Sequence, residues 1–476
     1  MRKRLTLTML AFCCVMAQSW GFKTKGDGTT YTFDTLCEQE GSGVTYEVQQ
    51  GIRIYTMSVN DTIAAGDRFD VSDARIVLLT DDVTFVIEGT ADFYSQQGCL
   101  FADMGILSPA NGVLMKDVSA STTFSSCYFV GVGLKFVGCA GGTLSNCTFQ
   151  ENNGAIGQSA LVLASNGATF TIDHSVFLDN PKAAVSSAAN ISCNLSITNC
   201  TLTNNGTENG NTPQLNLTVA DNIVIDHCTI TGNPEHTMVG AIGISNFYGR
   251  TGNNITISNC TIRDNRYGIG TVGPMDIAIK DNTLVDNKYE VNPMNGGSGI
   301  SLYDPLQLTN AMISGNHIEG SLWGITVIGC KNVNLGRTDV SADAPDYNAG
   351  GNTFKDNGNN GLLYDLYNNS ANTVYAQNNT WNVSHQTQEE IENVIFHKAD
   401  DATLGEVIYW PAATPAGIRE VEGSEFQDSS FKIQDSSSEF YDLRGVRHNN
   451  PQKGINIVRK NGRAYLLHLR TRGSVK

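Results

Sequence analysis

One short motif returns ten times between residues 124 and 381 and strongly constrains how this chain can fold. Its copies read FSSCYF, LSNCTF, IDHSVF, ITNCTL, IDHCTI, ISNCTI, IKDNTL, ISGNHI, AGGNTF and AQNNTW. The fourth position is always Cys, Ser or Asn, and successive copies lie 20 to 36 residues apart. A fixed motif at variable spacing indicates stacked coils whose connecting loops differ in length.

Each column of the repeat has one physical character. The position before the Cys/Asn column is rich in Asn, Asp, His and Gly, which tolerate a positive φ, so we expect a one-residue left-handed bend there. Two positions after the Cys/Asn column stands a large apolar residue, which predicts a stacked core. The bend column consists of Ser126, Asn146, His174, Asn199, His227, Asn259, Asp281, Gly315, Gly351 and Asn378. A second turn is predicted at Asn152, Asn180, Asn205, Asn233, Asn265, Asn287 and Asn357.

The segments between the turns are short and alternate between apolar and polar residues, as in NITIS. Downstream of each motif a glycine-led strand recurs, as in GIGTV, GSGISLY and WGITVIG. Three short strands per coil, with bends of Gly and Asn, predict an all-β fold. We expect a right-handed parallel β-helix with end caps and a small C-terminal β module.

Cysteine is common, with 12 residues, of which Cys13 and Cys14 lie in the N-terminal apolar segment. Several others occupy the inward Cys/Asn column. Disulfides between neighbouring coils are one interpretation, but their geometry is demanding, and stacked buried thiols behave as small apolar groups. We therefore favour free thiols over paired bridges in this column.

The two ends of the chain and its charge define its compartment and partners. Residues 1–19 combine three basic residues with an apolar run, which predicts a secretory signal peptide. No later apolar run is long enough to span a bilayer. The net charge is −16, with +3 in residues 1–19 and +7 in residues 438–476, which leaves −26 for residues 20–437. So acidic a body disfavours nucleic acid and favours sugars, cations or basic surfaces as partners.

Residues 101–385 resemble the pectin-lyase-like superfamily of right-handed β-helix proteins, because the units of the form I-x-N-C-T-F-x-x-N look like its repeat. By the same resemblance, residues 20–100 form an N-terminal strand-rich cap with the first coils. Residues 386–412 would be a C-terminal cap, with a short helix at QEEIENVIFHK and a final strand at GEVIYW. Such caps would cover the open edges of the stack.

The Ser-rich residues 413–437 read as a linker. After them, residues 438–476 contain YDLRG and KGINIV and resemble the C-terminal sorting domain of secreted Bacteroidetes proteins. The resemblance implies a protein that is secreted or held on the outer cell surface.

Candidate functional residues follow the glycine-led strands in the longest coils, where insertions of a solenoid gather. Acidic and basic residues there suit acid–base chemistry on sugars, and interleaved aromatic rings suit stacking on sugar faces. The candidate catalytic residues are Arg250, Asp304, Lys331 and Asp365. The candidate substrate-binding residues are Tyr248, Tyr303, Tyr364 and Tyr367. Ordinary solvated ion pairs are the simpler interpretation of the charged residues.

Two further stretches invite a chemical interpretation. Asp226, His227 and Cys228 adjoin in sequence, but their columns point out, bend and point in, so we expect a scaffold rung and not an active site. The loop RTDVSADAPDYN carries Asp339, Asp343 and Asp346, which could hold Ca²⁺ through oxygen ligands, although a plain acidic loop is favoured. We predict no resident cofactor or metal.

The leading hypothesis is an exported β-helix protein that binds or processes polysaccharide, as a binding module or as a lyase or glycosidase. The alternative is a non-catalytic structural or adhesive surface protein, because the tandem Asp pair and RIK of polygalacturonases and the RxPxxR of pectate lyases are missing.

Overall fold

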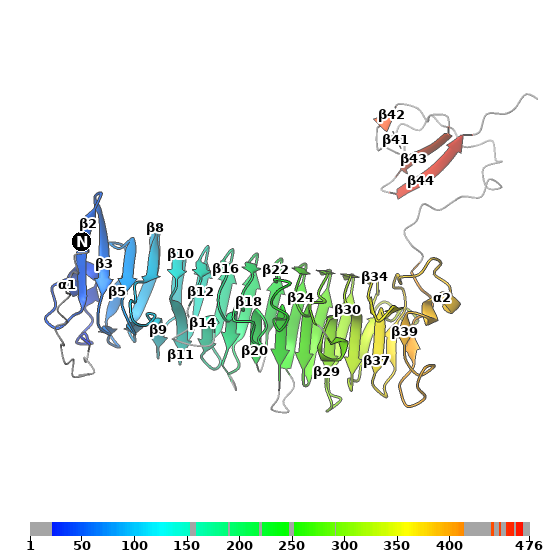
Figure 1. Ribbon diagram of the computed structural model, residues 1–476, viewed down its shortest axis with the longest axis horizontal. Coiled ribbons are helices and arrows are strands. Elements are labelled where there is room, and N and C mark those ends of the chain that lie inside the picture. The colour runs from blue at the N-terminus through cyan, green and yellow to red at the C-terminus, as the bar shows by residue number, and fades with distance from the viewer. Residues whose placement is uncertain are drawn as a thin grey trace, which may run out of the picture. The chain divides into compact units, whose positions relative to one another are not determined.

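The computed structural model describes residues 21–152, 159–188, 191–218, 221–246, 252–290 and 292–413, and the backbone of four strands between 439 and 469 (Figure 1). The chain divides into two compact units, Met1–Ala413 and Thr414–Lys476. In the first unit, short strands stack along one axis, coloured blue to orange in Figure 1. This unit is a right-handed parallel β-helix, which confirms the predicted fold class.

One face of the β-helix is a 13-stranded parallel sheet, called sheet A. Its inward residues are apolar, as Ile300 and Leu302 show, and its outward residues carry the polar and aromatic side chains. Its strands, in chain order, are β4 (Thr62–Ile63), β7 (Thr84–Ile87), β9 (Gly112–Lys116), β11 (Gly133–Val137), β14 (Ser159–Ala164), β17 (Ala183–Ser187), β20 (Leu215–Thr218), β23 (Ile242–Ser245), β26 (Ile269–Val272), β29 (Ser298–Tyr303), β32 (Trp323–Ile328), β37 (Leu366–Asn369) and β39 (Ile395–Phe396).

The other faces belong to a 25-stranded sheet, called sheet B, which runs as two tracks joined at the one-residue bend. The long strands β8 (Thr90–Asp103) and β10 (Thr122–Val130) contribute to both tracks. The first track continues through β12 (Gly141–Ser145), β15 (Thr169–Asp173), β18 (Asn194–Thr198), β21 (Ile223–Asp226), β24 (Gly252–Ser258), β27 (Met275–Lys280), β30 (Asn310–Ser314), β33 (Val333–Gly336), β38 (Val374–Ala376) and β40 (Val407–Ile408). The second continues through β13 (Thr148–Gln150), β16 (Val176–Leu178), β19 (Thr201–Thr203), β22 (Thr229–Thr231), β25 (Thr261–Arg263), β28 (Thr283–Val285), β31 (His317–Glu319) and β34 (Thr353–Lys355).

The bend column behaves as the sequence predicts. All ten residues have positive φ, from 47° at His174 to 79° at Gly351. At Gly315 a Cβ would lie 2.2 Å from a carboxylate oxygen of Asp281, so a larger residue there would displace that side chain. The apolar column stacks inside the coil, where the rings of Phe129, Phe149 and Phe177 lie parallel at 4.7 and 4.9 Å.

Buried side-chain amides tie each coil to the next. In the Cys/Asn column, Asn282 donates to Asn316, which donates to Asn352, which donates to Asn379, at 2.9–3.0 Å. Each Asn oxygen in turn accepts from the backbone N–H one coil earlier, as Asn316 does from Asn282. A buried amide satisfied at both ends in this way fixes the register of successive coils.

The second amide ladder corrects one sequence expectation. Asn205 donates to Gln214, which donates to Asn265, at 2.9 and 3.0 Å. Gln214 therefore fills the place that the repeat assigns to Asn233. Asn233 is instead partly exposed and accepts from the backbone N–H of Glu235. The reason is geometric. Gln214 stands just before β20, and its side-chain amide reaches the position between Asn205 and Asn265.

All ten cysteines from Cys37 onward are free thiols in the structure, and nine of them are buried. They fill the core of the stack as the favoured interpretation expects. Burial raises the pKa of Cys99 to about 12, which keeps this thiol protonated and unreactive at neutral pH.

Both ends of the stack carry additional elements. At the N-terminal end lie the strand β1 (Thr30–Tyr31), helix α1 (Phe33–Cys37), the hairpin of β2 (Val44–Gln49) and β3 (Ile52–Met57), and strands β5 (Arg68–Asp70) and β6 (Ile76–Leu79). The buried carboxylate of Asp67 accepts from the N–H groups of Gly26, Gly28 and Thr29 and so ties the first segment to the stack. At the other end, α2 (Gln388–Glu392) lies within the segment expected to form the capping helix.

Three short elements and a separate sheet complete the description. The 3₁₀ turn η1 (Pro293–Asn295) precedes β29, and β35 (Gly358–Asn359) pairs with β36 (Leu362–Leu363) in a small hairpin. In the second unit, β41 (Glu439–Tyr441), β42 (Arg447–His448), β43 (Gly454–Lys460) and β44 (Arg463–Leu469) form a four-stranded antiparallel sheet. Within the described residues, none of the helices has the length and apolar character that crossing a bilayer would take.

The Gln214 rung gives a direct test of the ladder. We expect Gln214→Ala to lower the free energy of unfolding by about 2–4 kcal/mol, because it removes the acceptor of the buried Asn205 backbone N–H and the donor to the buried Asn265 side-chain oxygen. Asn233→Ala is the matched control and should cost about 1 kcal/mol or less, since that side chain only caps a turn. Urea unfolding of both variants measures the difference, and equal losses would contradict the ladder assignment.

Candidate functional site

The predicted site residues that the structure describes lie at two opposite ends of sheet A. Tyr248 and Arg250 lie outside the described residues. Tyr303 ends β29 opposite Ile328, and exposed Lys331 follows that same end of the sheet. Tyr364 and Asp365 lie at the opposite end, just before β37. The strands of sheet A thus separate these candidates into two groups.

Asp304 holds a turn together. Its side chain is fully buried, and its carboxylate accepts from the backbone N–H groups of Leu306, Leu308 and Thr309 at 2.8–2.9 Å. The Thr309 hydroxyl donates to the same carboxylate at 2.8 Å. The two carboxylate oxygens thus accept four hydrogen bonds from the same loop, and these bonds stabilise the turn after β29. A catalytic role for Asp304 stays a prediction.

Asp365 is buried beneath the same end of sheet A as Tyr364. One carboxylate oxygen accepts from the backbone N–H of Asn382 at 2.7 Å, and the other accepts from the Asn357 amide at 3.3 Å. Burial raises the pKa of Asp365 to about 7. A carboxyl group with such a pKa suits proton transfer chemically, but this side chain has no exposed surface.

Two of the predicted tyrosines belong to an aromatic cluster, which we define as Trp323, Tyr364, Tyr367 and Phe396. The Trp323 ring lies 4.7 Å from that of Tyr364 and 5.1 Å from that of Tyr367. Tyr367 stacks on Phe396 at 4.8 Å and 17°. All four side chains are partly exposed.

Strand register builds this cluster. Tyr367 pairs with Thr326 on one side and with Phe396 on the other, so its ring stands on the outer face of sheet A between β32 and β39. The Trp323 indole N–H donates to the carbonyl of Pro293, which fixes this ring at the start of β32. Sequence reasoning missed Trp323 and Phe396. The signal for Trp323 was its position at the head of the glycine-led strand WGITVIG.

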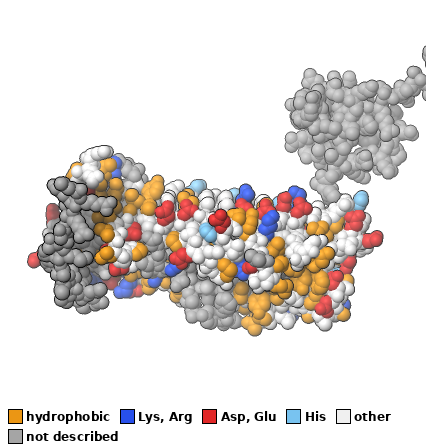
Figure 2. Space-filling model, viewed as in Figure 1, with side chains coloured by type: hydrophobic (Ala, Val, Ile, Leu, Met, Phe, Trp, Pro, Cys, Tyr) orange, Lys and Arg blue, Asp and Glu red, His pale blue; other side chains and the backbone are white. Residues whose placement is uncertain are grey.

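The surface around the cluster is apolar. Met294, Leu362 and Leu363 are exposed by 83%, 60% and 41%. Figure 2 shows hydrophobic side chains gathered over the late coils at the lower right of the β-helix. Partly exposed rings beside exposed aliphatic groups mark a surface suited to an amphipathic ligand.

An almost buried ion pair supports the loop that holds Trp323. Arg266 donates to Glu290 at 2.8 Å, and the two side chains are only 10% and 9% exposed. The guanidinium also donates to the Asn211 side chain at 2.7 Å and to the carbonyl of Asn295 at 2.6 Å. It therefore connects three loops and holds η1, whose Pro293 binds the indole.

Asp226 and His227 form a side-chain contact that the sequence analysis did not predict. Their positions point outward and bend as predicted, and Cys228 is buried, but the first two side chains do meet. His227 Nδ1 lies 2.6 Å from the carboxylate, which also accepts from Ser258 and Asn259 of the next coil. These bonds, together with the neighbouring imidazole, offset the effect of burial and lower the pKa of Asp226 to about 2.

The same arrangement recurs two coils earlier at Asp173 and His174, again at 2.6 Å. The Asp173 carboxylate accepts from Thr198 and Asn199 of the next coil. The left-handed bend turns each imidazole back over the preceding carboxylate, which column-by-column reasoning did not foresee. Each pair fastens one coil to the next on sheet B, away from the aromatic cluster.

The acidic loop considered for Ca²⁺ is organised by an arginine. Arg337 forms ion pairs with Asp339 and Asp346, and its guanidinium stacks over Tyr375 at 4.1 Å. Two of the three expected carboxylates are thus paired with a cation. In the part of the chain that is described, no group of three or more His, Cys, Asp or Glu side chains is placed to hold a metal ion.

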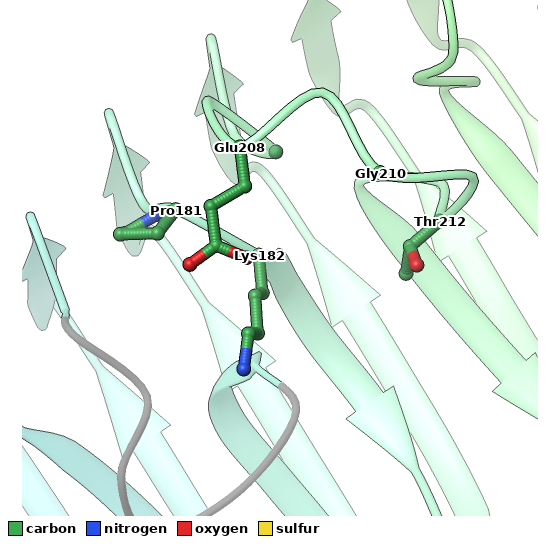
Figure 3. A pocket seen from close by; sticks show the side chains of 6 residues that line it. Pro181, Lys182, Glu208, Gly210 and Thr212 are labelled. Atoms are coloured by element: carbon green, nitrogen blue, oxygen red, sulfur yellow. The ribbon is translucent and has the colours of Figure 1, made fainter.

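A small cavity of about 180 Å³ lies near β17, several coils before the aromatic cluster. It is lined by Pro181, Lys182, Gly206, Glu208, Gly210 and Thr212. Figure 3 shows Lys182 and Glu208 on neighbouring loops at its rim. None of the predicted site residues lines it.

Comparison with known proteins agrees with the fold. The family described as right handed beta helix region matches residues 192–340. No curated protein matches the sequence. The chain is therefore a right-handed β-helix protein by its architecture.

Among solved structures, the periplasmic alginate epimerase AlgG is similar at 11% identity over 81% of this chain and 83% of that chain, with a TM-score of 0.48. The A-module of the Azotobacter vinelandii mannuronan C-5 epimerase AlgE4 is similar at 13% identity over 75% of this chain and 91% of that chain, with a TM-score of 0.24.

Asp365 makes the stability of the protein depend on pH. Its pKa in the folded state, about 7, lies above the ordinary value of 3.8, so the unfolded chain releases this proton first as pH rises. Stability is therefore highest below about pH 4 with respect to this group and falls by at most about 1.4 kcal/mol per pH unit until about pH 7.

We expect Asp365→Asn to remove this dependence, so that its melting temperature relative to the wild type rises between pH 4.5 and 8. Asp276→Asn, at an exposed position of β27, is the control and should follow the wild-type profile. A constant difference between Asp365→Asn and the wild type over this pH range would contradict the assignment.

Proposed function

We propose that this chain is an exported β-helix protein that binds polysaccharide across the aromatic cluster. The observation that carries the proposal is the set of partly exposed rings on the successive strands β32, β37 and β39, with centroids 4.7–5.1 Å apart. Aromatic rings stack on the apolar faces of sugars, and the Tyr364 and Tyr367 hydroxyls can exchange hydrogen bonds with sugar hydroxyls.

Binding is favoured over catalysis at this surface. Glycosidases need two accessible carboxyl groups within about 5–10 Å of each other. Asp304 and Asp365 are instead buried and hold their own loops. The processing of polysaccharide by Arg250 or Lys331 stays a prediction.

Export is supported by the sequence, and the burial of nine of the ten cysteines from Cys37 onward is compatible with it. Residues 1–19 have the pattern of a signal peptide, and residues 438–476 resemble a sorting domain of secreted Bacteroidetes proteins. The thiols are buried, which protects them in an oxidising compartment. We infer that the mature protein is secreted or held on the outer cell surface.

The cluster is tested by truncating its central ring. We expect Trp323→Ala to weaken polysaccharide binding about tenfold, because the indole is in contact with both tyrosines and its loss removes a stacking surface. Affinity electrophoresis against a panel of soluble glycans, followed by calorimetry, measures the effect. Tyr128→Ala is the matched control, since Tyr128 is an exposed ring on sheet B.

The same panel separates the alternatives. New reducing ends or the ultraviolet absorbance of unsaturated products would show that the protein processes the polysaccharide it binds. The absence of binding to every glycan tested would refute the proposal and favour the structural or adhesive role. Equal losses for Trp323→Ala and Tyr128→Ala would place binding elsewhere on the β-helix.

A further inference from the structure

We infer that the aromatic cluster is built for an uncharged polysaccharide and disfavours polyuronates. This inference rests on the proposed function, and it goes further by naming the class of ligand. A polyuronate carries a carboxylate on each sugar unit, so a site for it needs accessible cations, commonly arginine forks. Around the cluster, by contrast, an exposed carboxylate is present and the nearby arginine is already paired.

The loop that follows Phe396 of the cluster carries an exposed carboxylate. Burial raises the pKa of Tyr367, and Tyr364 and Asp401 raise it further. Asp401 is exposed on the loop after β39, where it accepts from the backbone N–H and hydroxyl of Thr403 at 2.9 and 2.7 Å. These hydrogen bonds lower the pKa of Asp401 and keep it ionised at neutral pH. An exposed, ionised carboxylate therefore lies on the loop that begins just after Phe396 of the cluster.

The cations that contact the loop before β29 are already engaged. The guanidinium of Arg266 is nearly buried and donates to Glu290, Asn211 and the carbonyl of Asn295. Lys288 forms an ion pair with Asp286 at 2.5 Å. Withdrawing Arg266 to meet a uronate would leave the nearly buried Glu290 carboxylate without its partner, which costs free energy. The Lys288–Asp286 pair is more exposed, so its charge is already neutralised nearby but weakly held.

Two further cations of the late coils do not change this balance. Lys331 lies beyond the far end of β32, and the strand from Trp323 to Ile328 alone spans about 17 Å. Lys398 follows Phe396 by two residues and is exposed, but Asp400 and Asp401 share its loop. The loop as a whole is therefore acidic.

The wider field acts in the same direction. Residues 20–437 carry a net charge of −26, as the −16 of the whole chain less +3 at the start and +7 in the tail. An acidic body repels a polyanion at long range and lowers its local concentration, and salt weakens this repulsion. A neutral glycan is indifferent to this field, while its apolar faces match the rings and the aliphatic side chains of Met294, Leu362 and Leu363.

The test compares neutral and acidic glycans on the full mature chain. The neutral probes are soluble glucan, xylan and mannan, and the acidic probes are alginate and polygalacturonate. Calorimetry and tryptophan fluorescence are measured in 50 and 500 mM NaCl. We expect a neutral probe to bind with an affinity that changes less than about twofold with salt and falls about tenfold in Trp323→Ala.

A charge substitution tests the cause. Asp401→Lys replaces the anion beside Tyr367 by a cation and should raise polyuronate binding at least about fivefold at low salt. Asp276→Lys makes the same change in net charge at an exposed position of β27 on sheet B and should leave it nearly unchanged. Asp401→Asn separates removal of the anion from addition of a cation.

The outcomes distinguish the two proposals. Binding of polyuronates alone, weakened by Trp323→Ala, would overturn the inference and leave polysaccharide binding at the cluster intact. An equal gain from Asp401→Lys and Asp276→Lys would show that net charge and not the local anion excludes polyuronates, which also overturns it. Failure to bind any probe would refute the proposed function itself.

Discussion

The amide ladder on the inner side of the bend is the interaction on which the rest of this molecule depends. Each buried Asn accepts from the backbone of the preceding coil and donates to the amide of the next, as Asn316 does between Asn282 and Asn352. Register is thus fixed by side chains at the corner of the coil, where the hydrogen bonds are protected from water. The loops on the opposite side are then free to vary in length, and it is there, along sheet A, that the chain places its exposed rings.

How much could be predicted from the sequence depends on how local the physical requirement is. The bend column was predictable because a positive φ is a property of one residue, and all ten predicted positions have it. The ladder at Gln214 was not, because its amide comes from a different strand and fills a point in space that the repeat assigns to Asn233. Asp304 and Asp365 looked like candidates because the glycine-led pattern predicts that both follow strands, whereas Asp365 in fact lies just before β37. Alternation also does not say whether a carboxylate at a strand end turns inward to bind backbone amides.

The aromatic cluster was also only partly predictable from the sequence. Tyr364 and Tyr367 were predicted from their position beside a glycine-led strand, whereas Trp323 and Phe396 were recognised only when strand pairing placed them on adjacent rungs. The contact between Asp226 and His227 was not predicted for a related reason. Treating each column as independent assigns one direction to each side chain, but a left-handed residue rotates its side chain back over its neighbour, so that the imidazole and carboxylate meet.

The buried carboxyl group of Asp365 connects stability with the proposed binding surface. It lies between the two tyrosines in sequence, and it accepts from the backbone N–H of Asn382, while its own N–H donates to Val394 of the last coil. A carboxyl group whose pKa is raised to about 7 by burial is a costly way to hold a strand. Its effect is to fix the backbone that carries Tyr364 and Tyr367 against the C-terminal cap, so that the rings are oriented before a ligand arrives. Preorganisation of this kind lowers the entropy lost on binding, and it explains why a carboxyl group can be favoured there even though it makes no contact with the surface.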